Sequence, residues 1–512
     1  TSGNRLLVDT GNDTIAAIAT GAIFITEADG ATVGSVTVDG VTITGITTTG
    51  AGGSIDLVVT DGTLTVNEQI AATGAGNDVR IDVNGAGDDD DIVLASNGNV
   101  SATDQVELRA SRDITQATSS ITVSAVSLAM IAGRDIGTAF GDAAIDTNVT
   151  TLAASAGNAA AGNIFVRQTA AGGDLTIGEV TTGLAGTPTV TGAVANTNDG
   201  TVDVRTLDGG IVVSQVVTAA GTGNVVLDAF DTGANSTHSI DIQASITVDE
   251  GAGGDVHLRA DDAITRSTGA GTVSGDSIYF EVGTGVGASA NVIVTSAATL
   301  GVSAGGDVFI DEAAAGTDLA IGQVQDLITP GTFDGIATST DAVTIRLLAD
   351  GGTLTVTDAL AADTIRTSGA NVTLVADEMT FESGGGQLAV NAGAAIVVLK
   401  SLNAEAIDLG SAATTVDDVL ELSAAEIAEI SATGGSIVIG SDADATNVTA
   451  TSISLSTDVD FTTTNVLLTA TGDITSTAAA NEVDVNAGAG ALTFQAGGSV
   501  GTAGTAFGLE VA

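Results

Sequence analysis

The chain contains no cysteine among its 512 residues. This absence excludes disulfide bonds, thiol catalysis and cysteine-ligated zinc together. Tryptophan is also absent, tyrosine occurs once, and aromatic residues make up only 2% of the chain. The 44% of hydrophobic residues must therefore form a thin core of valine, isoleucine, leucine and alanine. Proline occurs twice against 68 glycines, which excludes both collagen and proline-rich linkers.

Basic residues are as scarce as aromatic ones. Twelve of them face 63 acidic residues, which gives a formal net charge of −51, and Lys400 is the only lysine. A field of this sign repels nucleic acid and anionic lipid, so neither is expected as a partner. The same field attracts divalent cations and keeps a long molecule soluble.

No run of about 18 apolar residues is present, so this segment is not expected to span a membrane. We also find no signal peptide, and the first residues already have the pattern of a strand. The last residues stop where an earlier copy of the same pattern continues. We therefore expect the chain to be a segment of a longer exported polypeptide.

What the chain does contain is internal repetition. The stretch Gln105–Ala139 returns without a gap at Asp255–Ser289, and more loosely at Asn465–Ala503. A chain that repeats its own apolar positions is typical of repeat proteins. The pattern predicts one domain, residues 1–512, built from three superrepeats: 51–199, 200–341 and 342–512.

Within each superrepeat, short Val- and Thr-rich segments recur at roughly 18–25 residues, the length of solenoid coils. β-Branched residues favour strands, and glycine, asparagine and aspartate between the segments favour turns. The pattern predicts an all-β fold, a right-handed parallel β-helix forming a continuous rod. At about 22 residues per coil and a strand spacing of about 4.8 Å, the rod would be on the order of 110 Å long. The segment Asp417–Ile430 alone has the pattern of a short helix, but its surroundings favour a strand.

One repeated motif resembles a known family. It reads V-x-L-x-A-x-x-D-I-T, then L-x-x-x-A-G-x-D-I-G-T-A, and its residues are Val106, Leu108, Ala110, Asp113, Ile114, Thr115, Leu128, Ala132, Gly133, Asp135, Ile136, Gly137, Thr138 and Ala139. The motif is similar to those of the filamentous-haemagglutinin-like exoproteins of Gram-negative bacteria. The resemblance implies a right-handed parallel β-helix at the cell surface, serving adhesion, biofilm formation or display. It also implies partners among glycans, host or neighbouring cells, and further repeats or subunits of a fibre.

The densest acidic cluster is the candidate metal site. Asp88, Asp89, Asp90 and Asp91 are consecutive, and Ca²⁺ takes six to eight oxygen ligands. The alternative is a solvated corner loop, which is the more common role of such a run. Ca²⁺ is the only cofactor that the sequence suggests, and an array of calcium-binding repeats is not present.

Other acidic residues are expected to stabilise turns. Asp113, Asp135, Asp261, Asp262 and Asp473 fall at turn positions, where the side chain of aspartate commonly bonds the backbone two residues on.

Two arginines, Arg109 and Arg259, recur at matching positions beside Glu107 and His257. They are expected to point outward in surface ion pairs. His257 and His238 are the only histidines, and no catalytic motif surrounds either of them.

The sequence therefore predicts a structural or adhesive segment of a secreted, filamentous cell-surface protein of a Gram-negative-type bacterium, with no catalytic residues. Two alternatives stay open: a calcium-bridged matrix or sheath filament, and a β-helical polysaccharide lyase or hydrolase. An enzyme of the latter kind needs carboxylates and a basic group clustered in one groove, whereas the acids here are spread over all three superrepeats. Threonines at Thr42–Thr49 suggest a flat ice-binding face, but the array does not persist.

Overall fold

The computed structural model describes most of the chain in residue ranges separated by short gaps. They are 5–8, 14–87, 89–157, 162–169, 173–182, 184, 189–196, 199–230, 237–248, 253–313, 318–339, 341–348, 351–357, 362–382, 386–411, 419–461, 464–477, 485–501 and 509–510. The chain divides into two compact units. Unit 1 comprises Thr1–Asp262 with Ser267–Thr272, and unit 2 comprises Ala263–Arg266 with Val273–Ala512.

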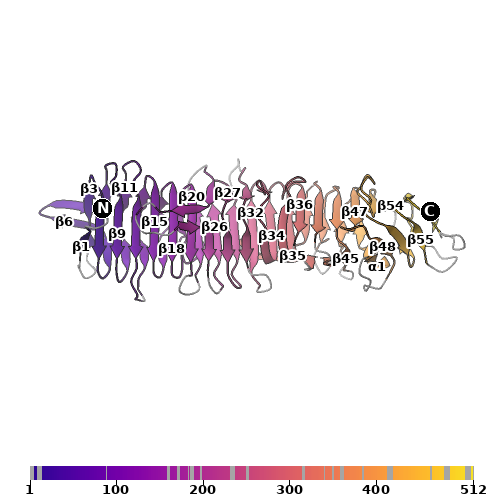
Figure 1. Ribbon diagram of the computed structural model, residues 1–512, viewed down its shortest axis with the longest axis horizontal. Coiled ribbons are helices and arrows are strands. Elements are labelled where there is room, and N and C mark those ends of the chain that lie inside the picture. Colours follow the sequence, from indigo (N-terminus) through magenta and orange to yellow (C-terminus); the bar gives the residue numbers. More distant parts are fainter. Residues whose placement is uncertain are drawn as a thin grey trace. The chain divides into compact units, whose positions relative to one another are not determined.

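Most coils in the first half of unit 1 contain one longer and two shorter strands (Figure 1). The longer strands are β1 (Leu6–Val8), β4 (Ile23–Glu27), β9 (Ile55–Val59), β12 (Val79–Val83), β15 (Gln105–Ala110), β18 (Ser127–Ala132) and β20 (Thr151–Ala156). The shorter strands are β2 (Thr14–Ile15), β5 (Ala31–Val33), β10 (Leu64–Val66), β13 (Ile92–Leu94) and β16 (Ile114–Gln116), followed in each coil by β3 (Ala17–Ala19), β8 (Ile46–Thr48), β11 (Ile70–Ala72), β14 (Val100–Ala102) and β17 (Val123–Ser124).

Strands of the main ladders pair in parallel with strands of the neighbouring coils. Ile81, for example, stands opposite Leu57 on one side and Leu108 on the other, and all three side chains are fully buried. Side chains alternate along a strand, so stacking of like residues produces a continuous aliphatic core. The predicted all-β class and parallel β-helical fold are confirmed.

Long and short strands exchange places after one superrepeat. The ladder of longer strands that ends with β20 continues into two short ones, β22 (Leu175–Ile177) and β25 (Ala193–Ala195). Conversely, the short strand β17 continues through β19 (Ile145–Asn148) into longer strands. These are β21 (Ile164–Gln168), β26 (Val202–Thr206), β29 (Val225–Ala229) and β32 (Asp255–Ala260).

Unit 2 repeats the same construction (Figure 1). Its main ladder consists of β34 (Val273–Val282), β35 (Ile293–Ala304), β36 (Val308–Glu312), β41 (Val343–Leu347), β44 (Val372–Val375), β47 (Ile396–Lys400), β51 (Ser436–Ile439), β54 (Asn465–Ala470) and β57 (Leu492–Ala496). Shorter strands complete the coils, among them β37 (Leu319–Ile321), β40 (Ile336–Thr338), β42 (Thr353–Val356), β43 (Ile365–Arg366) and β45 (Glu378–Phe381).

The prediction of a strand across Asp417–Ile430 is wrong in part. Val419–Leu422 does form strand β49, but Ala424–Ala428 forms the short helix α1. Ser423 caps this helix by accepting a hydrogen bond from the backbone N–H of Glu426, whose carboxylate accepts one from the N–H of Ser423. This reciprocal cap, together with the burial of Ile427, stabilises a helical turn where a strand was expected. Residues 417 and 418 lie outside the described ranges.

Antiparallel hairpins leave the coils at three places that correspond in sequence. They are β6 (Ser35–Val38) with β7 (Val41–Thr44), β23 (Glu179–Thr181) with β24 (Thr189–Thr191), and β38 (Gln323–Asp326) with β39 (Gly331–Asp334). A pair of glycines closes each base through one backbone hydrogen bond from the second glycine to the first. The N···O distances are 2.9 Å for Gly45 to Gly34, 2.8 Å for Gly192 to Gly178, and 2.9 Å for Gly335 to Gly322.

The later two hairpins fold back over coils that precede them in the chain. In unit 1, Val180 and Val190 pack on Ala129 and Ala153, and all four side chains are buried. In unit 2, Phe333 stacks on Tyr279 with ring centroids 5.0 Å apart. The hairpins thus add small secondary cores on the outside of the coils.

Within the described residues, no helix is both long enough and apolar enough to cross a membrane.

Candidate metal centre at an acidic corner

Aspartates at the corners of the coils bind backbone groups of the next coil. Asp91 Oδ1 accepts a hydrogen bond from the N–H of Asp113 at 3.0 Å, and Asp113 Oδ1 accepts one from Asp135 at 2.9 Å. Asp135 continues the series by accepting from the N–H of Asn163 at 2.8 Å. The expectation that Asp113 and Asp135 bond the backbone two residues on is therefore wrong, because the next coil brings a donor N–H to each of them.

The same arrangement occurs elsewhere among the predicted turn residues. Asp473 Oδ1 accepts from the N–H of Ser499 at 2.6 Å. Asp261 and Asp262 instead contact side chains of the preceding coil, His238 Nδ1 and Ser239 Oγ, each at 3.2 Å. Corner aspartates in this fold therefore connect successive coils.

The predicted cluster of four aspartates does not act as one group. Asp88 lies outside the described residues. Asp91 instead belongs to the series of corner aspartates that bind the next coil, and Arg112 Nη1 lies 3.7 Å from its Oδ2. Burial raises the pKa of the Asp91 carboxyl, although the N–H of Asp113 and the Arg112 guanidinium act in the opposite direction.

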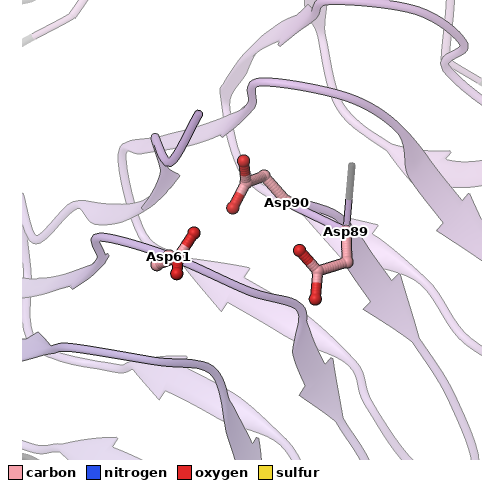
Figure 2. A group of neighbouring side chains, drawn as sticks. All are labelled: Asp61, Asp89 and Asp90. Atoms are coloured by element: carbon pink, nitrogen blue, oxygen red, sulfur yellow. The ribbon is translucent and has the colours of Figure 1, made fainter. Parts of the chain in front are cut away.

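Asp89 and Asp90 instead face Asp61, one coil earlier (Figure 2). Asp61 lies in the turn between β9 and β10, and the other two lie just before β13. The parallel pairing of Leu64 with Ile92 brings these turns together. One carboxylate oxygen from each residue lies within 4.8 Å of the others.

Asp90 is the buried member of this trio. Its side chain is fully inaccessible, whereas Asp61 and Asp89 are exposed. Asp90 Oδ1 accepts a hydrogen bond from the N–H of Gly62 at 2.8 Å, but the buried Oδ2 has no hydrogen-bond partner among the described residues. Charged oxygen atoms buried without a partner are rare because desolvation strongly disfavours them.

A glycine leaves room between the three carboxylates. A Cβ atom at Gly87 would lie 2.8 Å from Asp89 Oδ1, 3.3 Å from Asp61 Oδ1 and 3.6 Å from Asp90 Oδ2. The three oxygens therefore converge on a space that a side chain at Gly87 would fill. Hard cations such as Ca²⁺ prefer oxygen donors of this kind, with water and carbonyl oxygens completing the coordination.

Elsewhere, buried carboxylates on the strands pair with arginines. Arg167 Nε lies 2.6 Å from Asp146, Arg205 Nη2 lies 2.7 Å from Asp203, and Arg259 Nη2 lies 2.7 Å from Asp228. Arg346 pairs in the same way with Asp311. No ion pair between described residues involves Asp61, Asp89 or Asp90.

The predicted surface ion pairs of Arg109 and Arg259 differ from each other. Arg259 contacts Asp228 on the neighbouring strand through both Nε and Nη2. Arg109 is 41% exposed, and its Nε lies 4.0 Å from Asp82. Each arginine pairs with an aspartate of the neighbouring coil, so neither pairs with the residue beside it in sequence.

Glu107 is buried between Arg80 of the preceding coil and strand β18 of the following coil. The sequence pattern did not predict this burial. Glu107 Oε2 lies 3.6 Å from Arg80 Nε. Burial raises the pKa of Glu107 to about 7, with a further upward contribution from Asp82 and opposing contributions from Arg80 and Arg109.

Sequence reasoning missed Asp61 as a member of the acidic group. The signal that points to it is its position in the repeated segment Asp61–Val66, whose strand pairs with the strand after Asp90. Comparison with known proteins adds no further candidate: no family model, no curated protein and no solved structure matches the chain.

Proposed function

We propose that the chain is a structural and adhesive segment of a filamentous cell-surface protein, acting as a stalk or fibre. The observation that carries this proposal is that one coil design recurs throughout both units, with aliphatic side chains at its inward positions. Such repetition extends a molecule without adding a distinct site.

The mechanical properties of such a segment follow from its bonding. Strands of the main ladders are hydrogen-bonded to a strand of the preceding coil and to one of the following coil, and their inward side chains are buried. Local opening of a coil must therefore break two ladders and expose apolar surface, which disfavours bending and proteolysis. The net charge of −51 keeps neighbouring molecules apart except where cations bridge them.

The proposed location is the outer surface of a Gram-negative-type bacterium, with glycans or other cell surfaces as partners. Support comes from the resemblance of the repeated motif to filamentous-haemagglutinin-like exoproteins. Because the chain has no cysteine, its stability depends on packing and hydrogen bonds, neither of which changes with the redox state of the environment.

The enzymatic alternative is a polysaccharide lyase or hydrolase. A groove of unit 1 lies between β24 and the coils beneath it, and Arg109 is the one charged residue among the described residues that line it. Glycan cleavage by this class needs a carboxylate or another base beside the scissile bond. The groove therefore offers binding surface but not the acid–base pair.

Electron microscopy of the purified chain, combined with a glycan depolymerisation assay, tests the proposal. We expect elongated particles and no release of oligosaccharides from acidic or neutral glycans. Compact particles would contradict the filament, and depolymerisation that Arg109→Ala abolishes would favour the enzyme. Arg134→Ala, which changes another exposed arginine of unit 1, serves as the control.

A further inference from the structure

We propose that Asp61, Asp89 and Asp90 bind one Ca²⁺ ion that joins two successive coils of unit 1. This proposal concerns a site within one chain, and it does not rest on the filament function. It differs from the consecutive cluster suggested by sequence, because Asp61 replaces Asp91 and belongs to another coil.

The first argument is the buried oxygen. Asp90 is fully inaccessible, and the one hydrogen bond to its carboxylate comes from Gly62 and engages Oδ1. Oδ2 faces the same space beside Gly87 as oxygens of Asp61 and Asp89, and it has no hydrogen-bond donor in the described part of the chain. Figure 2 shows the three carboxylates side by side. A cation is the partner that satisfies this oxygen and also reduces the repulsion among three carboxylates.

The second argument comes from the next superrepeat, where a histidine side chain occupies the corresponding place and contacts two carboxylates. Asp61 lies three residues before Leu64, and Asp208 lies three residues before its counterpart Ile211. Asp90 precedes Ile92 by two residues, and His238 precedes Ile240 by two. In that copy His238 Nε2 lies 3.2 Å from Asp208 Oδ1.

His238 also contacts Asp261 through Nδ1, so an imidazole stands between two carboxylates in the second superrepeat. The first superrepeat has an aspartate at the position of this histidine. A partner for the carboxylates of the first superrepeat must then come from solution, which is the role we assign to the metal ion.

The donor set selects the type of metal. All three side-chain donors are carboxylates, and no histidine or cysteine is among them, so zinc and copper are disfavoured. Two of the three donors are exposed, which leaves coordination positions for water. Ca²⁺ tolerates such an irregular shell, whereas Mg²⁺ requires near-octahedral geometry.

Equilibrium dialysis of the full chain against radioactive calcium, at moderate salt to suppress weak surface binding, tests the site. We expect one site with a dissociation constant of about 10⁻⁴–10⁻³ M, the range of extracellular calcium modules. Asp90→Asn should weaken this binding at least tenfold. Asp208→Asn, which changes the matching carboxylate of the second superrepeat, should leave it unchanged.

Gly87→Ala provides a second variant that does not change any charge. Gly87 has no positive φ, so alanine adds no backbone strain there, but its Cβ would fill the space between the carboxylates. Loss of the site in this variant, with an unchanged circular dichroism spectrum, would support the proposal. Unchanged binding in both Asp90→Asn and Gly87→Ala would overturn it, and equal affinity for Mg²⁺ would overturn the assignment to calcium.

Discussion

Glu107 and His257 occupy the same position in successive superrepeats, and both side chains are buried. Glu107 stands opposite Arg80 of the preceding coil, and His257 stands opposite Val226. One position of the repeat thus holds a different titratable side chain in each of these two copies. The environment of Glu107 makes the stability of the first copy depend on pH.

Glu107→Gln should flatten the pH dependence of stability. The pKa of Glu107 is raised from 4.5 to about 7 in the folded chain, so the folded state holds this proton more tightly than the unfolded state. The contribution of Glu107 is fully present below pH 4.5 and is lost as pH rises through 7, by at most about 3 kcal/mol. Denaturant unfolding of both proteins at pH 4, 6 and 8 measures the difference.

At pH 8 the glutamine variant should be the more stable protein, and at pH 4 the two should agree. Glu179→Gln, at an exposed strand position, is the control and should behave as the unmodified chain does. Parallel pH profiles of the chain and of Glu107→Gln would contradict the raised pKa.

Arg259→Ala should destabilise unit 1 much more than Arg109→Ala does. Arg259 makes two short contacts with the buried Asp228, and removing it leaves that carboxylate poorly compensated. We expect a loss of about 2–3 kcal/mol, near the lower end for a buried pair. The exposed and more distant pair of Arg109 with Asp82 should contribute less than about 1 kcal/mol.

Thermal unfolding of the two variants measures this difference. The comparison is matched, because both variants replace an arginine at the same position of the repeat. Equal losses would show that the geometry of the pair does not determine its contribution.

Gly301→Ala should displace the hairpin β38–β39. A Cβ atom at Gly301 would lie 2.4 Å from Val324 Cγ2, and overpacking of this kind costs about 1–3 kcal/mol. Tyr279, the only tyrosine of the chain, stacks on Phe333 of this hairpin, so its fluorescence reports the displacement. Adding Val324→Ala to Gly301→Ala should restore the fluorescence, because it removes the clashing methyl groups.

Asp135→Ala should weaken the corner that it forms with the next coil. Asp135 Oδ1 accepts hydrogen bonds from both the backbone N–H and the side-chain amide of Asn163. Loss of bonds to a charged acceptor should cost about 1.5–3 kcal/mol, whereas Asp135→Asn keeps a carbonyl acceptor and should cost less. Amide hydrogen exchange at Asn163 measures the effect directly, and unchanged protection in Asp135→Ala would contradict it.

The coil architecture was predictable because its causes are local. Alternation around Val106 and Leu108 identifies strands, and glycines and aspartates between strands identify corners. A superrepeat copied at fixed spacing then requires a solenoid. Helix α1 also had a readable signal, the capping box of Ser423 and Glu426, which its strand-rich surroundings outweighed.

The acidic site was not predictable in the same way, because it depends on which residues stack on each other. Gly62 and Asp90 contact across 28 residues, whereas Asp91 and Asp113 contact across 22. Coil length therefore varies within one superrepeat. Sequence repetition shows which residues are equivalent between copies, but it does not show which of them are neighbours.

The exchange of long and short strands determines where equivalent features of unit 1 are displayed. The hairpin β6–β7 leaves the ladders of β5 and β8, whereas β23–β24 leaves strands that continue the ladder of β20. Two hairpins that correspond in sequence therefore belong to different sides of the coil. A bivalent partner with both binding sites on one face cannot engage both hairpins, so avidity at these hairpins requires a partner that wraps around the unit.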